Sequence, residues 1–131
     1  MVNTKRAFTL IELMVVILIV GILAAASVPL LNARVDSAKW AEANGAAGMI
    51  RNAVKIYYAQ TGNSITGSLS GGSLMNILEI RTGDLTGTYF VASDYNIDSV
   101  NANGFATITV TGSQPNAPTG SKTLQANGDW D

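Results

Sequence analysis

Residues 5–33 read KRAFTLIELMVVILIVGILAAASVPLLNA, and residues 13–33 of this stretch carry no charged side chain. As an α-helix those residues would be about 31 Å long, which matches the ~30 Å hydrocarbon core of a bilayer. Lys5 and Arg6 precede the apolar run. The positive-inside rule therefore places the N-terminus in the cytoplasm and the rest of the chain on the other side of the membrane.

The composition excludes several kinds of chemistry. The chain has 131 residues, with no Cys and no His. A disulfide, a thiolate zinc site and a Ser-His-Asp triad are therefore excluded, and we do not expect an enzyme. The net charge is −1, and the residues beyond 60 carry six Asp or Glu against two Lys or Arg. We expect no nucleic-acid partner for this acidic part.

The apolar segment has two ordinary interpretations. It is either a secretory signal peptide, with Ala24-Ala25-Ala26 as the small-residue cleavage site, or a signal anchor that stays in the membrane. Neither explains Glu12. A carboxylate at the centre of a spanning helix costs about 2.5–3.5 kcal/mol, although a position in the first turn is more favourable.

Residues 5–24 resemble the N-terminus of a type IV pilin or pseudopilin precursor, and the resemblance extends to about residue 30. It implies a leader of residues 1–7, cleavage between Ala7 and Phe8 by a prepilin peptidase, and methylation of the Phe8 amine. The chain departs from the family in one respect, because Ala7 stands where most members have Gly. Glu12 matches the glutamate that, in this family, pairs with the N-terminal amine of a neighbouring subunit.

Physical chemistry agrees with that role. A lone carboxylate would be strongly disfavoured inside a bundle of apolar helices, whereas a pair between Glu12 and the amine of Phe8 is tolerable. Apolar burial against other copies would supply association energy, and the pair would set the register. The resemblance implies as partners other copies of the chain, the inner membrane before assembly, the prepilin peptidase and the pilus assembly machinery.

The sequence predicts one long helix over residues 8–61, with a transmembrane part at 8–33 and an amphipathic continuation at 34–61. Gly62 is a plausible stop. We expect a kink or local unwinding at Pro29, and Gly21 weakens the helix as well. Arg51 and Lys55 are interpreted as solvated. Apolar residues at i, i+4 and i+7 mark the expected packing face, namely Leu31, Val35 and Ala38, then Ile50, Val54 and Tyr57.

Residues 62–131 are predicted to form a small globular region. Its composition suggests a flexible linker at 62–73 and a short helix from Leu74 to Leu78 capped by Ser73. Residues 101–104, Asn-Ala-Asn-Gly, form a strong turn signal. Expected strands cover 89–91, 95–100, 105–111 and 122–126. The predicted fold is α+β, with a small antiparallel sheet packed against the outer half of the long helix.

One group of side chains suggests a metal. Asp94, Asn96 and Asp98 are spaced like the start of an EF-hand loop, but Ser99 replaces its Gly and Phe105 its bidentate Glu. The EF-hand interpretation therefore fails. Related secretion pseudopilins bind calcium near their C-termini, so an alternative calcium site would use Asp94, Asp98, Asp129 or Asp131. Strand alternation explains the same residues as a solvated face, and we expect no cofactor.

The resemblance implies a structural subunit of a type IV pilus, first a single-pass protein of the bacterial inner membrane and then part of a surface filament. The alternative is the major pseudopilin of a type II secretion system, in a periplasmic pseudopilus. The missing Cys favours the pseudopilin, whereas the polar sheet and the ending Leu124 to Trp130 resemble disulfide-free pilins. A DNA-uptake or adhesion minor pilin is a third interpretation, disfavoured by the acidic outer region.

Overall fold

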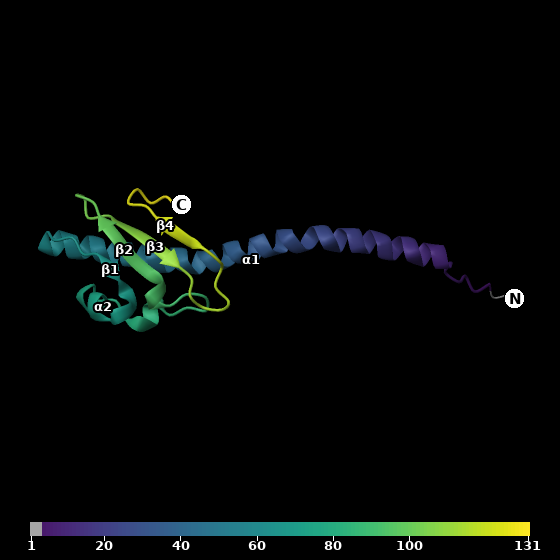
Figure 1. Ribbon diagram of the computed structural model, residues 1–131, viewed down its shortest axis with the longest axis horizontal. Helices are drawn as coiled ribbons and strands as arrows, with labels where there is room; N and C mark the ends of the chain where they lie inside the picture. The colour runs from purple at the N-terminus through teal and green to yellow at the C-terminus, as the bar shows by residue number, and fades with distance from the viewer. Residues whose placement is uncertain (1–3) are drawn as a thin grey trace. The chain divides into compact units, whose positions relative to one another are not determined.

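The computed structural model describes residues 4–131, so the first three residues of the predicted leader lie outside it. The chain divides into two compact units at residue 36, and each unit is described by itself. Helix α1 (Leu10–Thr61) begins in the first unit and ends in the second (Figure 1). With the four-stranded antiparallel sheet of the second unit, it confirms the predicted α+β class.

The first unit consists of a segment without regular structure up to Thr9, followed by the apolar part of α1. The helix is long and apolar enough to cross a membrane, a test that a signal sequence also passes. None of its most apolar window is buried within the chain. This unit therefore has no hydrophobic core of its own.

Pro29 lies inside α1, and the residues on both sides of it are helical. The local unwinding that we expected at this position is therefore not observed, and the expected kink stays a prediction. A proline removes only its own N–H from the helical hydrogen bonds. The flanking turns retain theirs, and the Ser27 hydroxyl also donates to the carbonyl of Leu23 at 2.7 Å.

The second unit is built on one antiparallel sheet in the order β1-β2-β3-β4. Its strands are β1 (Gly67–Ser68), β2 (Tyr95–Val100), β3 (Ala106–Thr111) and β4 (Ser121–Leu124). In the central strand β3, Ala106, Ile108 and Val110 are buried and alternate with threonines, as the sequence predicts. The polar face forms a threonine ladder, because Thr109 lies opposite Thr123 on β4 with their hydroxyls 3.1 Å apart.

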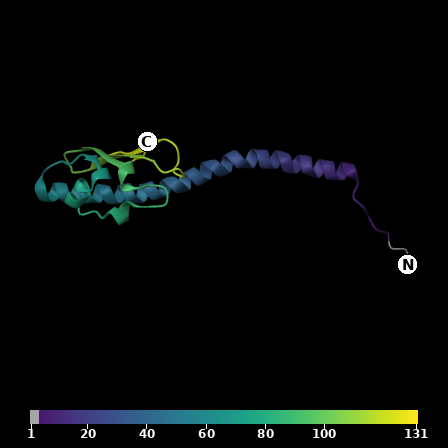
Figure 2. The same ribbon diagram turned by 60° about the horizontal axis from the view of Figure 1, so that its bottom comes forward.

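The C-terminal part of α1 runs beneath the sheet (Figure 2). One stripe of its side chains is part of the hydrophobic core. The stripe recurs at three- and four-residue intervals, as expected for one face of an α-helix. Its buried members are Trp40, Ala43, Ala47, Ile50 and Val54. Ile50 and Val54 lie on the apolar face that the sequence predicts and are buried, whereas Leu31, Val35 and Ala38 are exposed. The core begins instead at Trp40, which touches the ring of Phe90.

Residues 62–73 are not a flexible linker. They contain β1 and a 3₁₀-helix, η1 (Leu69–Gly71), and Leu69 is fully buried. The short helix α2 (Ser73–Ile77) follows, as predicted. The predicted cap is displaced by one residue, because Gly72 occupies the N-cap with a φ of 70° and Ser73 is the first helical residue. The polar composition of residues 62–73 gave no indication that Leu69 is buried and holds this segment against the core.

Two other expectations have clear outcomes. The turn at residues 101–104 is confirmed: Gly104 has a φ of 79° and donates its N–H to the carbonyl of Asn101 at 2.9 Å.

The predicted strand at 89–91 is wrong. This segment runs between two 3₁₀-helices, η2 (Thr82–Leu85) and η3 (Ala92–Asp94), and Glu42 of α1 takes the backbone hydrogen bonds that a strand would give to a neighbour.

Candidate assembly site

The candidate site lies at the start of α1, where Thr9 and Glu12 form hydrogen bonds with each other. The Glu12 carboxylate accepts hydrogen bonds from the N–H of Thr9 at 2.8 Å and from its hydroxyl at 2.9 Å. The Thr9 hydroxyl in turn accepts from the N–H of Glu12 at 3.3 Å. This reciprocal arrangement is a capping box, which fixes where the helix begins. The helix therefore starts at Leu10 rather than at Phe8, and the spacing Thr-x-x-Glu was a signal that our sequence reasoning missed.

The two residues predicted to flank the cleavage lie just before this cap. Ala7 and Phe8 are in the segment without helix or strand, and Phe8 is 86% exposed. Together with Arg6, Thr9 and Glu12 they line a surface hollow of about 360 Å³. The structure thus brings Ala7, Phe8 and Glu12 to one place. An irregular, exposed backbone of this kind is open to a peptidase, because no regular hydrogen bonding has to be broken first.

The helix beyond the cap is apolar on all sides and uncovered. A helix of this type is stable only in a membrane or against other apolar surfaces. Burial of each large side chain would be worth about 1.5–3 kcal/mol. The large apolar residues between positions 8 and 35 are all at least 42% exposed; they are Phe8, Leu10, Ile11, Leu13, Met14, Val15, Val16, Ile17, Leu18, Ile19, Val20, Ile22, Leu23, Val28, Leu30, Leu31 and Val35.

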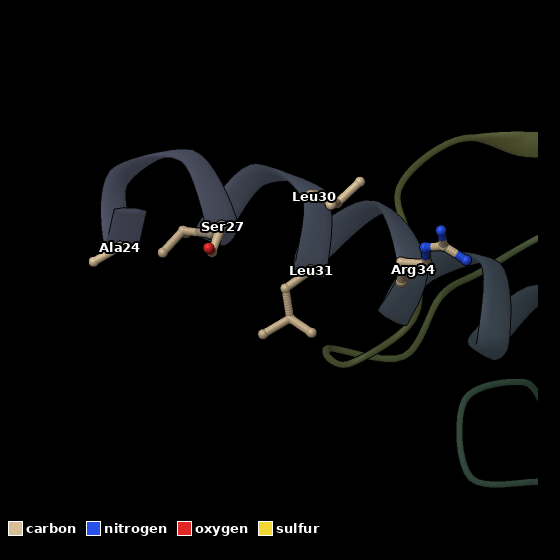
Figure 3. A pocket seen from close by; sticks show the side chains of 6 residues that line it. Ala24, Ser27, Leu30, Leu31 and Arg34 are labelled. Atoms are coloured by element: carbon tan, nitrogen blue, oxygen red, sulfur yellow. The ribbon is translucent and has the colours of Figure 1, made fainter. Parts of the chain in front are cut away.

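The predicted helix-weakening residues lie further along the same surface. A β-carbon on Gly21 would meet nothing within 4 Å in the described part of the chain, so the glycine serves no packing need inside one copy. Beyond it, side chains around Pro29 border a shallow apolar groove of about 420 Å³ (Figure 3). The groove is lined by Ala24, Ser27, Val28, Leu30, Leu31 and Arg34.

The calcium candidates are not brought together. Asp94 is buried, contrary to the expected solvated position, and its Oδ2 accepts from the N–H of Val91 at 3.0 Å. Its Oδ1 is buried and has no hydrogen-bond partner. Asp98 does lie on the exposed face, where it accepts from Asn96 and Thr109, each at 2.6 Å.

Asp129 and Asp131 are each occupied locally. Asp129 accepts from the side-chain amide of Asn127 at 2.7 Å, and Asp131 accepts from that of Gln125 at 2.6 Å. Across residues 4–131 no group of three His, Cys, Asp or Glu side chains is placed to hold a metal ion. The calcium hypothesis therefore gains no support and stays a prediction.

Two charged residues that hold the second unit together were missed. The Glu42 carboxylate accepts three successive backbone N–H groups, from Thr88, Tyr89 and Phe90, at 2.9–3.0 Å. Gly87 is required beside it, because a β-carbon there would overlap the carboxylate. The local sequence carries no signal for this contact, since the partners are more than 45 positions apart.

The second missed residue is Arg51, which we had interpreted as solvated. Its guanidinium lies 4.8 Å from the centre of the Phe105 ring and donates to the carbonyl of Ala126. The Lys55 ammonium lies 4.4 Å from the same ring. Arg51 thus connects α1 both to Phe105, the residue before β3, and to the C-terminal segment. In that segment Trp130 is half-buried against the core, as predicted for a packing residue.

Two comparisons with known proteins found a match to this chain. Residues 2–28 match the family model described as the prokaryotic N-terminal methylation motif. The chain is 43% identical over 60 residues to the fimbrial protein EcpC of Eikenella corrodens. That alignment covers 46% of this chain and 39% of the relative's length. No solved structure matches the chain.

The residues that match the methylation motif thus include the cap and the first, uncovered part of the apolar helix. The motif and the fimbrial relative both support the resemblance to type IV pilin precursors that residues 5–24 show. The α+β fold of the described residues is the one that this resemblance implies.

Proposed function

We propose that the chain is a structural subunit of a type IV pilus, processed between Ala7 and Phe8 and assembled through α1. One observation carries the proposal: an apolar helix surface, uncovered within the described chain, begins at a capping box that holds one carboxylate. A bilayer covers such a surface in the precursor, and other copies of the helix cover it in a filament. The protein acts by assembly and not as an enzyme.

The geometry supports a specific role for Glu12. Its Oε2 is held by the backbone and hydroxyl of Thr9, next to the residue whose amine cleavage would free. The carboxylate retains Oε1 for a further donor. In a filament core that donor is the amine of Phe8 of a neighbouring copy, because a buried carboxylate needs a positive partner. The pair would select one axial register among helices whose apolar surfaces would otherwise slide.

The proposal includes the route of the protein. The precursor spans the inner membrane once, a prepilin peptidase cleaves it on the cytoplasmic side and methylates Phe8, and the assembly machinery moves it into a surface filament. The exposed, irregular segment around Ala7 and Phe8 supports access for the peptidase. Ala7 in place of the usual Gly keeps the side chain before the cut small.

A second candidate is the major pseudopilin of a type II secretion system. It is favoured by one observation, the absence of Cys, because many major pilins close a C-terminal loop with a disulfide. Electron microscopy of material sheared from cells that express the chain separates the two. Long surface filaments containing the chain support the pilus, whereas periplasmic assemblies and lost protein secretion on deletion support the pseudopilin.

Mass spectrometry of the mature N-terminus tests both candidates against the ordinary alternatives. We expect a chain beginning at Phe8 with a methylated amine. A chain that begins at Ser27 would mean a secretory signal peptide, and one that retains Met1 would mean an anchor. Either result contradicts assembly through a processed α1.

A further inference from the structure

Glu79 differs from the other carboxylates of the second unit. Glu42, Asp84, Asp94, Asp98, Asp129 and Asp131 each accept a hydrogen bond. Glu79 is exposed and takes part in no such contact in the described chain. Its φ of 56° is the sole positive value of a non-glycine residue among residues 4–131. A glycine would fit this backbone with less strain, so the side chain is retained at a cost in stability.

Glu79 borders a hollow between α1 and the end of α2. The hollow has a volume of about 260 Å³, and Ala53, Ile56, Gln60 and Ile77 contribute to its walls. Ile56 is 58% and Ile77 48% exposed, although the core of this unit lies directly beside them. The feature is therefore an apolar depression with one free negative charge at its rim.

Residues of the first unit form a complementary surface. Leu30 and Arg34 are four residues apart and project from the same side of α1 (Figure 3). Leu30 is 62% exposed, and Arg34 is exposed, with no side-chain partner in the described part of the chain. This surface is an apolar knob with one free positive charge a helical turn away.

We propose that these two surfaces are the two halves of one contact between copies of the chain. Leu30 of one copy enters the hollow beside Ile56 and Ile77 of the next, and Arg34 pairs with Glu79. This inference rests on the proposed function. The two halves are different surfaces, so a contact of this kind can repeat from copy to copy along a filament.

The other cations fit less well. Lys39, Arg51, Lys55 and Lys122 each lie over an aromatic ring of the second unit. Arg81 has buried neighbours, Ile80 and Leu85, and so offers no exposed apolar group beside its charge. Lys5 and Arg6 would leave with the leader. Arg34 is the cation that combines a free charge with an exposed apolar knob.

The absence of Cys makes disulfide cross-linking a clean test. A chain with Arg34→Cys and a differently tagged chain with Glu79→Cys are produced in the same cells, and filaments are treated with a mild oxidant. A heterodimer carrying both tags can form only between copies. The matched control replaces Glu79→Cys with Arg81→Cys, which is also exposed and lies two residues away.

We expect at least about a tenfold higher heterodimer yield from the first pair than from the control pair, because cross-linking follows effective concentration. Intact filaments without the heterodimer, or with equal yields from both pairs, would overturn the contact and leave the proposed function standing. If the natural chain forms no filament and Phe8 is unmodified, the proposed function fails and the contact fails with it.

Charge reversal provides an independent readout. Arg34→Glu and Glu79→Arg should each lower the amount of filament about tenfold or more, and the two changes in one chain should restore it. Membrane insertion and thermal unfolding of each variant serve as controls for folding. Unchanged filament in both single variants, or no recovery in the double variant, contradicts the pairing.

Discussion

Glu42 is the single side chain on which the loop before η3 depends most. It supplies the acceptor for three backbone N–H groups, and hydrogen bonds to a charged partner contribute about 1.5–3 kcal/mol. We expect Glu42→Ala to lower the free energy of unfolding of the second unit by about 2–3 kcal/mol. Chemical denaturation of the detergent-solubilised chain measures this. Asn44→Ala, at an exposed position on the same helix, is the control, and an equal effect of both changes would contradict the assignment.

We expect Tyr95 to make the free energy of unfolding fall as the pH becomes alkaline. The side chain is 1% exposed, and its pKa is raised above the ordinary value of 10.0 by burial first, then by the negative charges of Glu42 and Asp94. Above about pH 10 the unfolded chain releases the phenolic proton while the folded chain still holds it, so stability falls as the pH rises. Tyr95→Phe should reduce this fall.

The check is the free energy of unfolding of both chains, measured from about pH 7 to about pH 11. Below about pH 9 the difference between the two should be constant, because Tyr95 is protonated in both states. Parallel curves throughout the range would show that Tyr95 does not contribute to the alkaline loss.

Glu12 is the residue on which assembly is expected to depend. Glu12→Ala should leave membrane insertion intact, because it removes a charge from an apolar helix, and should abolish filaments. Removing one partner of a buried pair costs about 3–5 kcal/mol, more than about a hundredfold per contact. Filament yield and membrane fractionation measure the two effects. Glu12→Gln retains an oxygen for the Thr9 cap without the charge, so normal filaments from this variant would mean that the cap alone matters.

The C-terminus of helix α2 has a strained backbone that lowers the stability of the second unit, and we relate this strain to the role of Glu79 in assembly. Its C-terminus closes with a bond from the N–H of Ile80 to the carbonyl of Met75 at 2.9 Å, and Glu79 occupies the left-handed position that glycine usually takes. We expect Glu79→Gly to raise the stability of the second unit by about 1 kcal/mol. Thermal unfolding measures the gain.

Glu79→Ala is the matched comparison, because it removes the carboxylate but keeps the backbone strain. It should give no such gain in stability. Both variants should lose filament to a similar extent if the carboxylate contacts another copy. A stability unchanged by Glu79→Gly would show that the left-handed conformation carries no strain here.

The whole molecule combines two parts that need different surroundings. Every buried apolar residue of the core, from Trp40 to Leu124, belongs to residues 37–131, whereas the apolar part of α1 before residue 36 is exposed. We therefore predict that residues 37–131 fold in water without the first unit. Circular dichroism and a cooperative thermal transition test this, and aggregation or a non-cooperative melt would contradict it. The substitution Ile50→Asp in the same fragment should abolish the transition, because it places a charge in the core.

The features predicted correctly from the sequence all depend on neighbours close in the chain. The apolar run, the stop at Gly62, the turn at residues 101–104 and the alternation of β3 are set by local backbone preferences and by which side chains recur on one face. Ala7, Phe8 and Glu12 also lie within six positions of one another, and their roles in processing and assembly stay predictions. The fold class followed because one apolar helix and a few short alternating strands admit few arrangements.

Tertiary structure alone decided which residues meet across long stretches of chain. Nothing near Glu42 in the sequence shows that it binds the backbone of Thr88 to Phe90, and nothing near Arg51 shows that it lies over Phe105. Because of these contacts, residues 89–91 form a loop instead of the predicted strand. Arg51, predicted to be solvated, instead connects α1 to Phe105. A polar group pairs with whatever the packing of the apolar core places beside it, and that packing depends on the whole chain at once.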